Sequence, residues 1–203
     1  DEELVRLVES WTGSLDAYGL RISTGPVVPF RATELIEKAG DVPRTHVPLL
    51  WMNHVRGMQV TWPLGRHKPE YMAHTMAAQP LLVPNANYVL MRRFSAKEEA
   101  RRLVAAPYLA SAFAVPMVGL ENHLNYVYRP KGQLTTHEAI GLAALFNSAL
   151  LDGYFRISNG NTQVSATELR TMPLPSLAVI NALGQRVQRE KPTQEALDAL
   201  VMM

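Results

Sequence analysis

The chain has 203 residues with 20 basic and 18 acidic side chains, so its formal net charge is +2. That length suits one domain with a sizeable core, and 47% apolar against 19% charged residues excludes a disordered or fibrous chain. The absence of cysteine excludes disulfides, thiolate metal sites and a cysteine nucleophile. It is compatible with a reducing cytoplasm, which is the location we expect.

The hydropathy and the first residues indicate whether the chain spans a membrane or carries a targeting peptide. No apolar run approaches the roughly 18 residues of a membrane span, so we expect no membrane partner. The acidic start, Asp1-Glu2-Glu3, differs from a signal or transit peptide. Because there is no initiator methionine, we expect the chain to be a piece of a longer polypeptide.

The net charge is unevenly distributed. Residues 1–20 hold five acidic and one basic side chain, and residues 176–203 hold three of each sign. Residues 21–175 therefore hold 16 basic against 10 acidic side chains, a local charge of +6. A basic centre favours a polyanionic partner, although a solvated surface of mixed charge gives the same numbers.

Hydrophobic spacing predicts the elements of the first part of the chain. Apolar residues recur every three or four positions over 1–17, which is typical of an amphipathic helix, and 19–30 is expected to be extended. Short strands are expected near 47–52 and 57–62, followed by a long proline-rich loop near 63–80.

Capping boxes predict where three later helices begin. Ser95, Thr135 and Ser165 are each followed three residues later by glutamate. At a helix start, the hydroxyl of such a residue accepts from the glutamate amide, and the glutamate carboxylate accepts from the amide of the first residue. The expected helices run over 95–104, 136–151 and 166–172. Strands are expected over 87–94, 111–118 and 122–128, and terminal helices over 177–189 and 193–201.

This order of elements predicts an α+β fold. We expect a twisted, mostly antiparallel sheet or sheets, with a central helix near 136–151 and helices at both termini. Residues 1–18 are expected to form a linker or packing helix, residues 19–175 the main domain, and residues 176–203 a helical appendage.

Several motifs of catalysis and cofactor binding are missing. No two glycines lie two residues apart, and no Gly-Lys-Ser/Thr is present, so dinucleotide and phosphate loops are excluded. No lysine follows an acidic residue by two positions, as in metal-dependent nucleases, and there is no His-Glu-x-x-His. The chain also lacks the Asn/Asp-Pro-Pro-aromatic motif of DNA amino-methylation. We therefore expect neither a catalytic residue nor a metal site.

Polar side chains concentrate at two strand ends. Arg92 and Arg93 end a strand, so their side chains point to opposite faces, and a guanidinium fork suits a phosphate or a guanine edge. Asn122, His123 and Asn125 form a polar strand face that either bonds base edges or lies exposed at a sheet edge. Two predicted loops add the donors Asn53, Arg56, Arg66, His67 and Lys68.

Four blocks of the chain resemble a known family. They are 22–31 (ISTGPVVPFR), 87–102 (NYVLMRRFSAKEEARR), 121–126 (ENHLNY) and 155–170 (FRISNGNTQVSATELR). In this order they resemble the C-terminal target-recognition region of gamma-class adenine-specific DNA methyltransferases of restriction-modification systems. The last block, with 172–175 (MPLP), is also similar to recognition domains of type I restriction specificity subunits.

The resemblance implies a function that this chain would share with a catalytic part. Such enzymes use S-adenosylmethionine to methylate a flipped adenine. The motifs for that reaction would lie upstream, so residues 19–175 would be the DNA target-recognition domain, bound to duplex DNA and to a catalytic methyltransferase domain. We expect the cofactor only in the full-length parent. The predicted DNA-facing residues are Thr24, Arg31, Asn53, Arg56, Arg66, His67, Lys68, Arg92, Arg93, Asn122, His123 and Asn125.

Two alternatives stay open. The same module could be a stand-alone or partner-borne specificity subunit of a restriction-modification complex. A third hypothesis is a small hydrolase or nuclease using His123 with Glu121, against which the missing acidic-x-Lys element argues.

Overall fold

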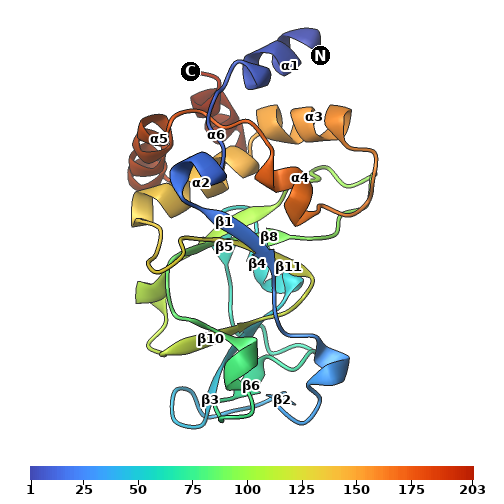
Figure 1. The fold of residues 1–203 in the computed structure, drawn as a ribbon, viewed down its shortest axis with the longest axis vertical. Helices are drawn as coiled ribbons and strands as arrows, with labels where there is room; N and C mark the ends of the chain where they lie inside the picture. The colour runs from blue at the N-terminus through green and yellow to red at the C-terminus, as the bar shows by residue number, and fades with distance from the viewer.

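Three layers follow one another along the long axis of the molecule (Figure 1). The computed structural model describes residues 1–203. Helices and both termini occupy one end, a four-stranded sheet lies beneath them, and a five-stranded sheet lies toward the opposite end. We call these the helical end and the β end. No helix has both the length and the apolar character that crossing a membrane requires.

The elements have the following bounds. The α-helices are α1 (Glu2–Glu9), α2 (Thr136–Phe146), α3 (Ala149–Ser158), α4 (Ala166–Arg170), α5 (Leu177–Glu190) and α6 (Gln194–Val201). The strands are β1 (Arg21–Thr24), β2 (Ile36–Glu37), β3 (His46–Leu50), β4 (Val55–Arg56), β5 (Gln59–Val60), β6 (Tyr71–Ala73), β7 (Leu82–Pro84), β8 (Tyr88–Arg92), β9 (Ala105–Tyr108), β10 (Met117–Leu120) and β11 (Leu124–Tyr128). Two short 3-10 turns, η2 (Pro29–Arg31) and η3 (Met52–His54), carry predicted site residues.

The four-stranded sheet is buried on both faces. Its order is β1-β11-β8-β9, and every pair is antiparallel. Along β8, Val89 and Met91 enter the largest core, below the helices, whereas Tyr88 and Leu90 enter the core that faces the second sheet. A shift by one residue would exchange these two sets, so the two cores fix the register.

The second sheet has the order β2-β6-β3-β10-β7. Only β3 and β10 pair in parallel, and the other pairs are antiparallel. A two-stranded ribbon, β4-β5, packs against β8 and β9 of the four-stranded sheet. The predicted α+β fold with mostly antiparallel sheets is therefore confirmed.

Helix α2 is the centre of the helical end. Nine of its eleven residues are buried, because the sheet covers one side and α5 another. Gly141 of α2 and Gly184 of α5 let the two backbones approach closely. A Cβ at Gly141 would lie 2.0 Å from the carbonyl oxygen of Ile180, and one at Gly184 would lie 2.0 Å from that of His137.

The predicted helix over 136–151 is two helices. Asn147 breaks it by bonding to β9: its Nδ2 donates to the Ala105 carbonyl at 2.6 Å, and its Oδ1 accepts from the Ala105 amide at 3.0 Å. Ser148 then caps α3 by accepting from the Leu151 amide at 3.2 Å. The capping boxes at Thr135 and Ser165 and the two C-terminal helices are confirmed.

The predicted helix over 95–104 is wrong. The Ser95 hydroxyl accepts from the Arg102 side chain at 2.9 Å instead of capping a helix. The amides of Arg102 and Leu103 donate to Asp152 of α3, at 2.7 and 2.8 Å. These tertiary bonds replace the i to i−4 bonds of a helix, so the segment runs as turns toward β9.

Three other boundaries differ from the prediction. The helix expected over 1–17 ends at Glu9, since Gly13 exchanges two backbone bonds with Leu174, at 3.0 and 2.9 Å. The strand expected over 111–118 begins only at Met117, and the expected loop near 63–80 contains β6. The expected domain boundaries stay predictions, but one core contains Val8, Leu197 and the sheet.

The close approach of α2 and α5 leads to the first prediction. Gly184→Ala should lower the free energy of unfolding by about 3 kcal/mol, because the added methyl group overlaps the His137 carbonyl. Urea denaturation measures the change. Gly160→Ala is the matched control, because its Cβ would meet nothing within 4 Å. Equal stabilities of the two variants would contradict the tight crossing.

Candidate nucleic-acid interface

Strand pairing brings two predicted polar segments together at one end of the four-stranded sheet. Arg92 at the end of β8 pairs with Leu124 of β11, and the Arg93 amide donates to the His123 carbonyl at 2.9 Å. The β10–β11 turn therefore lies beside the arginine pair. We call the following residues the strand-end cluster: Arg92, Arg93, Phe94, Asn122 and His123.

The two arginines point to opposite faces, as their strand alternation predicts. Arg92 Nε donates to the Val55 carbonyl at 2.8 Å. Burial lowers the pKa of the Arg92 guanidinium, and neighbouring Arg56 adds to the decrease while Glu99 opposes it. A basic pair, Arg56 and Arg92, thus lies on the face of the sheet toward the β end.

Arg93 is largely occupied within the protein. Its Nη1 donates to the Asn122 carbonyl at 3.0 Å, and its guanidinium lies 5.3 Å from the centre of the Phe94 ring. The Gln163 amide oxygen, in the orientation that satisfies both ends of that amide, accepts from Arg93 at 2.9 and 3.1 Å. Arg93 therefore orders the β10–β11 turn and the segment before α4, rather than standing free for a ligand.

Glu121 fixes the ring of His123. The Glu121 carboxylate is fully buried, accepts from the His123 amide at 2.9 Å and contacts His123 Nδ1. Because a carboxylate accepts, Nδ1 carries the proton and Nε2 is left to bond a partner. The His123 side chain is 48% exposed and packs against Phe94, with ring centres 5.2 Å apart. It is a positioned donor or acceptor at the surface.

Two asparagine side chains have unsatisfied acceptors. The Oδ1 atoms of Asn53, in η3, and of Asn122 are buried and have no hydrogen-bond partner within the protein. Buried carbonyl groups normally have a partner, so both side chains are suited to rotating toward an incoming donor. The Asn122 backbone amide is itself bonded to the Val27 carbonyl at 2.9 Å.

Asn125 lies inside the molecule, and Thr24 is half-buried beside it. Asn125 is fully buried, and its Nδ2 donates to the Val164 carbonyl at 2.8 Å while its Oδ1 accepts from the Thr24 hydroxyl at 3.2 Å. Both ends of this amide are thus occupied by the protein. We leave the pair out of the interface and regard it as the link between the sheet and the segment before α4.

The loop between β5 and β6 presents three predicted residues together. Arg66, His67 and Lys68 are all exposed, and the Lys68 ammonium lies 4.5 Å from the centre of the Trp51 ring. We call residues 63–69 the basic loop. Trp51 follows β3, so this contact joins the loop to the segment that carries η3.

A buried His–Glu pair holds the basic loop. Glu70 accepts from His54 Nε2 at 2.6 Å and from the amides of Leu64 and Gly65 at 2.8 and 2.9 Å. His54 Nδ1 accepts from the Trp51 amide at 2.8 Å, so His54 is neutral with its proton on Nε2. His54 is fully buried and Glu70 is 3% exposed.

The pKa shifts of the pair follow from these contacts. Burial lowers the pKa of His54 below its ordinary value of 6.5, and the bond to Glu70 only partly offsets this. Burial alone would raise the pKa of Glu70, but the bonds from His54 and from the two loop amides outweigh it and lower the pKa below 4.5. The structure therefore favours a neutral imidazole beside a charged carboxylate.

Arg31 lies apart from these groups. It is exposed on η2, with its guanidinium 5.2 Å from the centre of the Phe30 ring. Phe30 is 74% exposed, which is unusual for a phenylalanine. The η2 turn follows Val27, which is bridged to Glu121, so the Phe30–Arg31 pair extends from the segment beside the β10–β11 turn.

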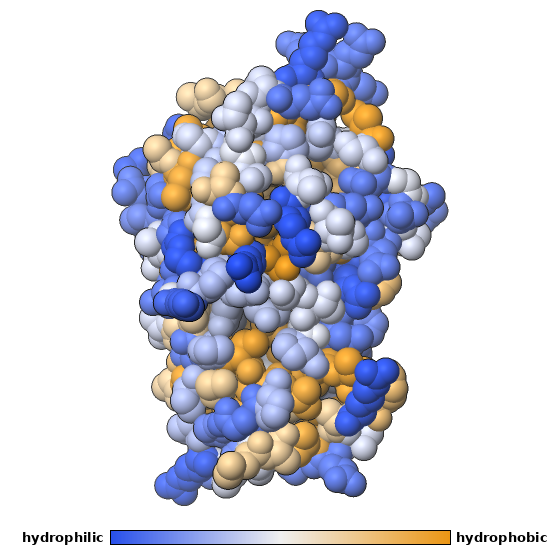
Figure 2. Space-filling view, viewed as in Figure 1, coloured by the Kyte–Doolittle hydropathy of each residue, from blue (hydrophilic) through white to orange (hydrophobic).

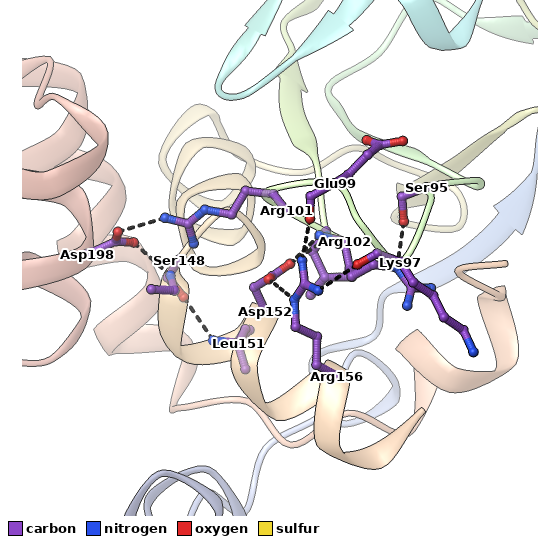
Figure 3. A network of polar contacts seen from close by, with 12 residues as sticks. Ser95, Lys97, Glu99, Arg101, Arg102, Ser148, Leu151, Asp152, Arg156 and Asp198 are labelled. Atoms are coloured by element: carbon purple, nitrogen blue, oxygen red, sulfur yellow. Dashed lines mark hydrogen bonds and ion pairs between the residues drawn. The ribbon is translucent and has the colours of Figure 1, made fainter. Parts of the chain in front are cut away.

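The arginines that follow the strand-end cluster along the chain serve the fold. In Figure 3, Arg101 reaches Asp198 of α6 at 2.8 Å. Arg156 of α3 bonds Asp152 at 2.9 Å and the Glu99 carbonyl at 2.7 Å. These bonds fasten the chain after Phe94 to the helical end, so the cluster has a rigid support.

Sequence reasoning missed the residues that position the interface. Phe30 and Phe94 each stand beside an arginine in the chain, and that adjacency was the available signal. The partners of the buried bonds, Glu70 with His54 and Gln163 with Arg93, lie far apart in sequence. No local pattern marks such pairs.

Type II methyltransferase M.BsuBI of Bacillus subtilis is 40% identical over 188 residues, which make up 92% of this chain and 37% of that protein. Type II methyltransferase M.PstI of Providencia stuartii is 35% identical over 202 residues, which make up 99% of this chain and 39% of that protein. The chain is similar to part of two type II methyltransferases.

The alignment covers nearly all of this chain but only a part of each relative. The chain spans under two fifths of the length of either relative, and no protein-family model matches it. Since 99% of the chain is matched to the second relative, the strand-end cluster and the basic loop belong to the shared part. The chain is thus a methyltransferase-related segment.

The buried pair gives a prediction of pH dependence. Both folded-state pKa values are lowered, so the unfolded chain binds protons first as the pH falls, on His54 below about 6.5 and then on Glu70 below about 4.5. The free energy of unfolding should therefore fall with decreasing pH. Protonation of His54 lowers the free energy of unfolding by at most about 1.4 kcal/mol per pH unit.

Urea denaturation at pH 7.5 and 5.5 tests this. The loss of stability between the two values should be smaller in His54→Gln than in the unmodified chain, because the titrating group is gone. His67→Gln, at an exposed histidine of the basic loop, should keep the original loss. Identical losses in all three proteins would contradict the assigned protonation of the pair.

Proposed function

We propose that the chain is the DNA sequence-recognition domain of an adenine-specific DNA methyltransferase. The proposal rests on a group of exposed polar side chains next to backbone that buried carboxylates fix. Glu121 bonds His123, and Glu70 bonds the amides of the basic loop. The strand-end cluster presents His123, and the basic loop presents Arg66, His67 and Lys68. The similarity to part of two type II methyltransferases supports a role beside a methyl-transfer reaction.

The donors divide into two roles by their chemistry. Arg31, Arg56 and Lys68 are exposed cations and would contact phosphates, which gives affinity without reading sequence. His123 and the asparagine amides of residues 53 and 122 would reach base edges in the major groove. His123 is fixed by Glu121, and a fixed hydrogen-bonding group discriminates between bases better than a mobile one.

Methyl transfer itself is assigned to another part of the enzyme. S-adenosylmethionine is the expected methyl donor, but the residues of the hollow beside α1 do not fit it. The hollow beside α1 is lined by aliphatic and charged side chains with no aromatic ring to stack on an adenine. The glycine loop and the Asn/Asp-Pro-Pro-aromatic motif are missing as well.

The helical end suits the catalytic part as a partner. Helix α1 buries only Val8, and Leu4, Leu7 and Met202 line a hollow together with carboxylates such as Glu3. In Figure 2, orange apolar atoms lie beside the hydrophilic top of the molecule, where α1 projects. Because the relatives are more than twice as long as the chain, we propose that their remaining part packs here.

The two alternatives differ in their support. A stand-alone or partner-borne specificity subunit would use the same interface, so the reading frame before the codon of Asp1 distinguishes it. A nuclease gains no support from the geometry. No group of three or more His, Asp and Glu side chains could hold a metal ion, and the Glu121 carboxylate is occupied by His123.

Salt-dependent DNA binding tests the proposal. The chain should bind a 20-base-pair duplex at about 50 mM salt, with an affinity that falls steeply as salt increases. Arg56→Ala should weaken binding several-fold on every sequence and reduce the salt slope by about one, because one phosphate contact is lost. Fluorescence anisotropy of a labelled duplex measures both.

Arg189→Ala is the control for this experiment. Arg189 is exposed on α5 at the helical end, so its loss should leave affinity and slope unchanged. Absence of binding at about 50 mM salt, or equal effects of the two substitutions, would contradict the proposed interface.

A further inference from the structure

The support of the basic loop is more extensive than a surface loop requires. Two tryptophans fix its C-terminal end: Trp62 Nε1 donates to the Glu70 carbonyl at 2.8 Å, and Trp51 Nε1 donates to the Pro69 carbonyl at 2.7 Å. At its N-terminal end, the amides of Leu64 and Gly65 donate to the Glu70 carboxylate. The backbone is thus fixed on both sides of the exposed tip.

The support contains a buried charge, which is costly unless it is fully bonded. The Glu70 carboxylate has three donors, of which only His54 is a side chain. His54 in turn is oriented by the Trp51 amide at 2.8 Å. The buried charge therefore holds the conformation of the loop, since its bonds join the loop amides to His54.

Such a support changes what the exposed tip can do. A phosphate contact tolerates a mobile cation, because the attraction depends weakly on direction. Reading a base edge requires donors held within about 0.5 Å of the productive geometry. A loop that is already ordered also loses less conformational entropy on binding. The fixed backbone on both sides of Arg66 and His67 therefore fits base reading better than phosphate attraction alone.

We propose that His54 and Glu70 are positioning residues for sequence discrimination, and that the loop they hold presents Arg66 and His67 to base edges of duplex DNA. The cation–π contact with Trp51 keeps Lys68 at the side of the loop, where its ammonium meets a phosphate. This inference rests on the proposed DNA-recognition function and adds a specificity-determining element to it.

Selection from a random duplex pool tests the inference. Duplexes bound by the unmodified chain at about 50 mM salt are enriched and sequenced, and one enriched duplex is paired with its scrambled counterpart. The ratio of the two affinities is the discrimination. Arg66→Ala and His54→Ala should each lower it about tenfold, while the affinity for the scrambled duplex changes less than about twofold.

Two controls separate positioning from folding. His54→Gln retains a donor toward Glu70, so it should keep more of the discrimination than His54→Ala. Arg44→Ala, at an exposed arginine outside the basic loop, should leave the ratio unchanged. Far-UV circular dichroism and a thermal melt identify variants that do not fold. If His54→Ala fails to fold, Arg66→Ala and His67→Ala decide the question alone.

The outcomes distinguish the two proposals. An unmodified chain that binds no duplex from the pool overturns the recognition function itself. A chain that discriminates, with folded loop variants that discriminate equally well, overturns the role of the loop and leaves recognition standing. Uniform weakening on both duplexes by Arg66→Ala also overturns the inference, because it identifies a phosphate contact.

Discussion

Strand β8 is covered by side chains on both faces, and most of the molecule is arranged around that constraint. Its alternating residues fill the core below the helices and the core toward the second sheet. The strand cannot slide, so its last residues have a fixed position and fixed directions. Arg92 is directed toward the β4-β5 ribbon and Arg93 toward the segment before α4.

Loops in this protein are held by buried side chains that bond to backbone atoms. Asp152 accepts the amides after the strand-end cluster, Asn147 bonds β9, and Glu70 accepts the amides of the basic loop. Each of these groups would be destabilising without its partners, so each bond specifies one loop conformation. The surface that we propose for DNA is consequently rigid, although it is built largely from turns.

The sequence predicts local features of this fold and fails where distant residues decide. The capping boxes at Thr135 and Ser165 identify helix starts because all their atoms lie within one turn. The same pattern at Ser95 misleads, since the competing donor, Arg102, and the acceptor Asp152 complete a tertiary network. At the site, residue type predicted the exposed cations but not the buried location of Asn125 or the supports under His123 and Lys68.

Both termini lie at the helical end, and the proposed DNA-facing loops lie on the sheets below it (Figure 1). A polypeptide joined to either end of the chain would thus begin on the side away from those loops. The module could be fused through its first or its last residue, or carried as a separate subunit, without blocking the surface that we propose reads DNA. If the proposed recognition function holds, exchange of such a module between proteins changes which sequence is bound and leaves the junction unaltered.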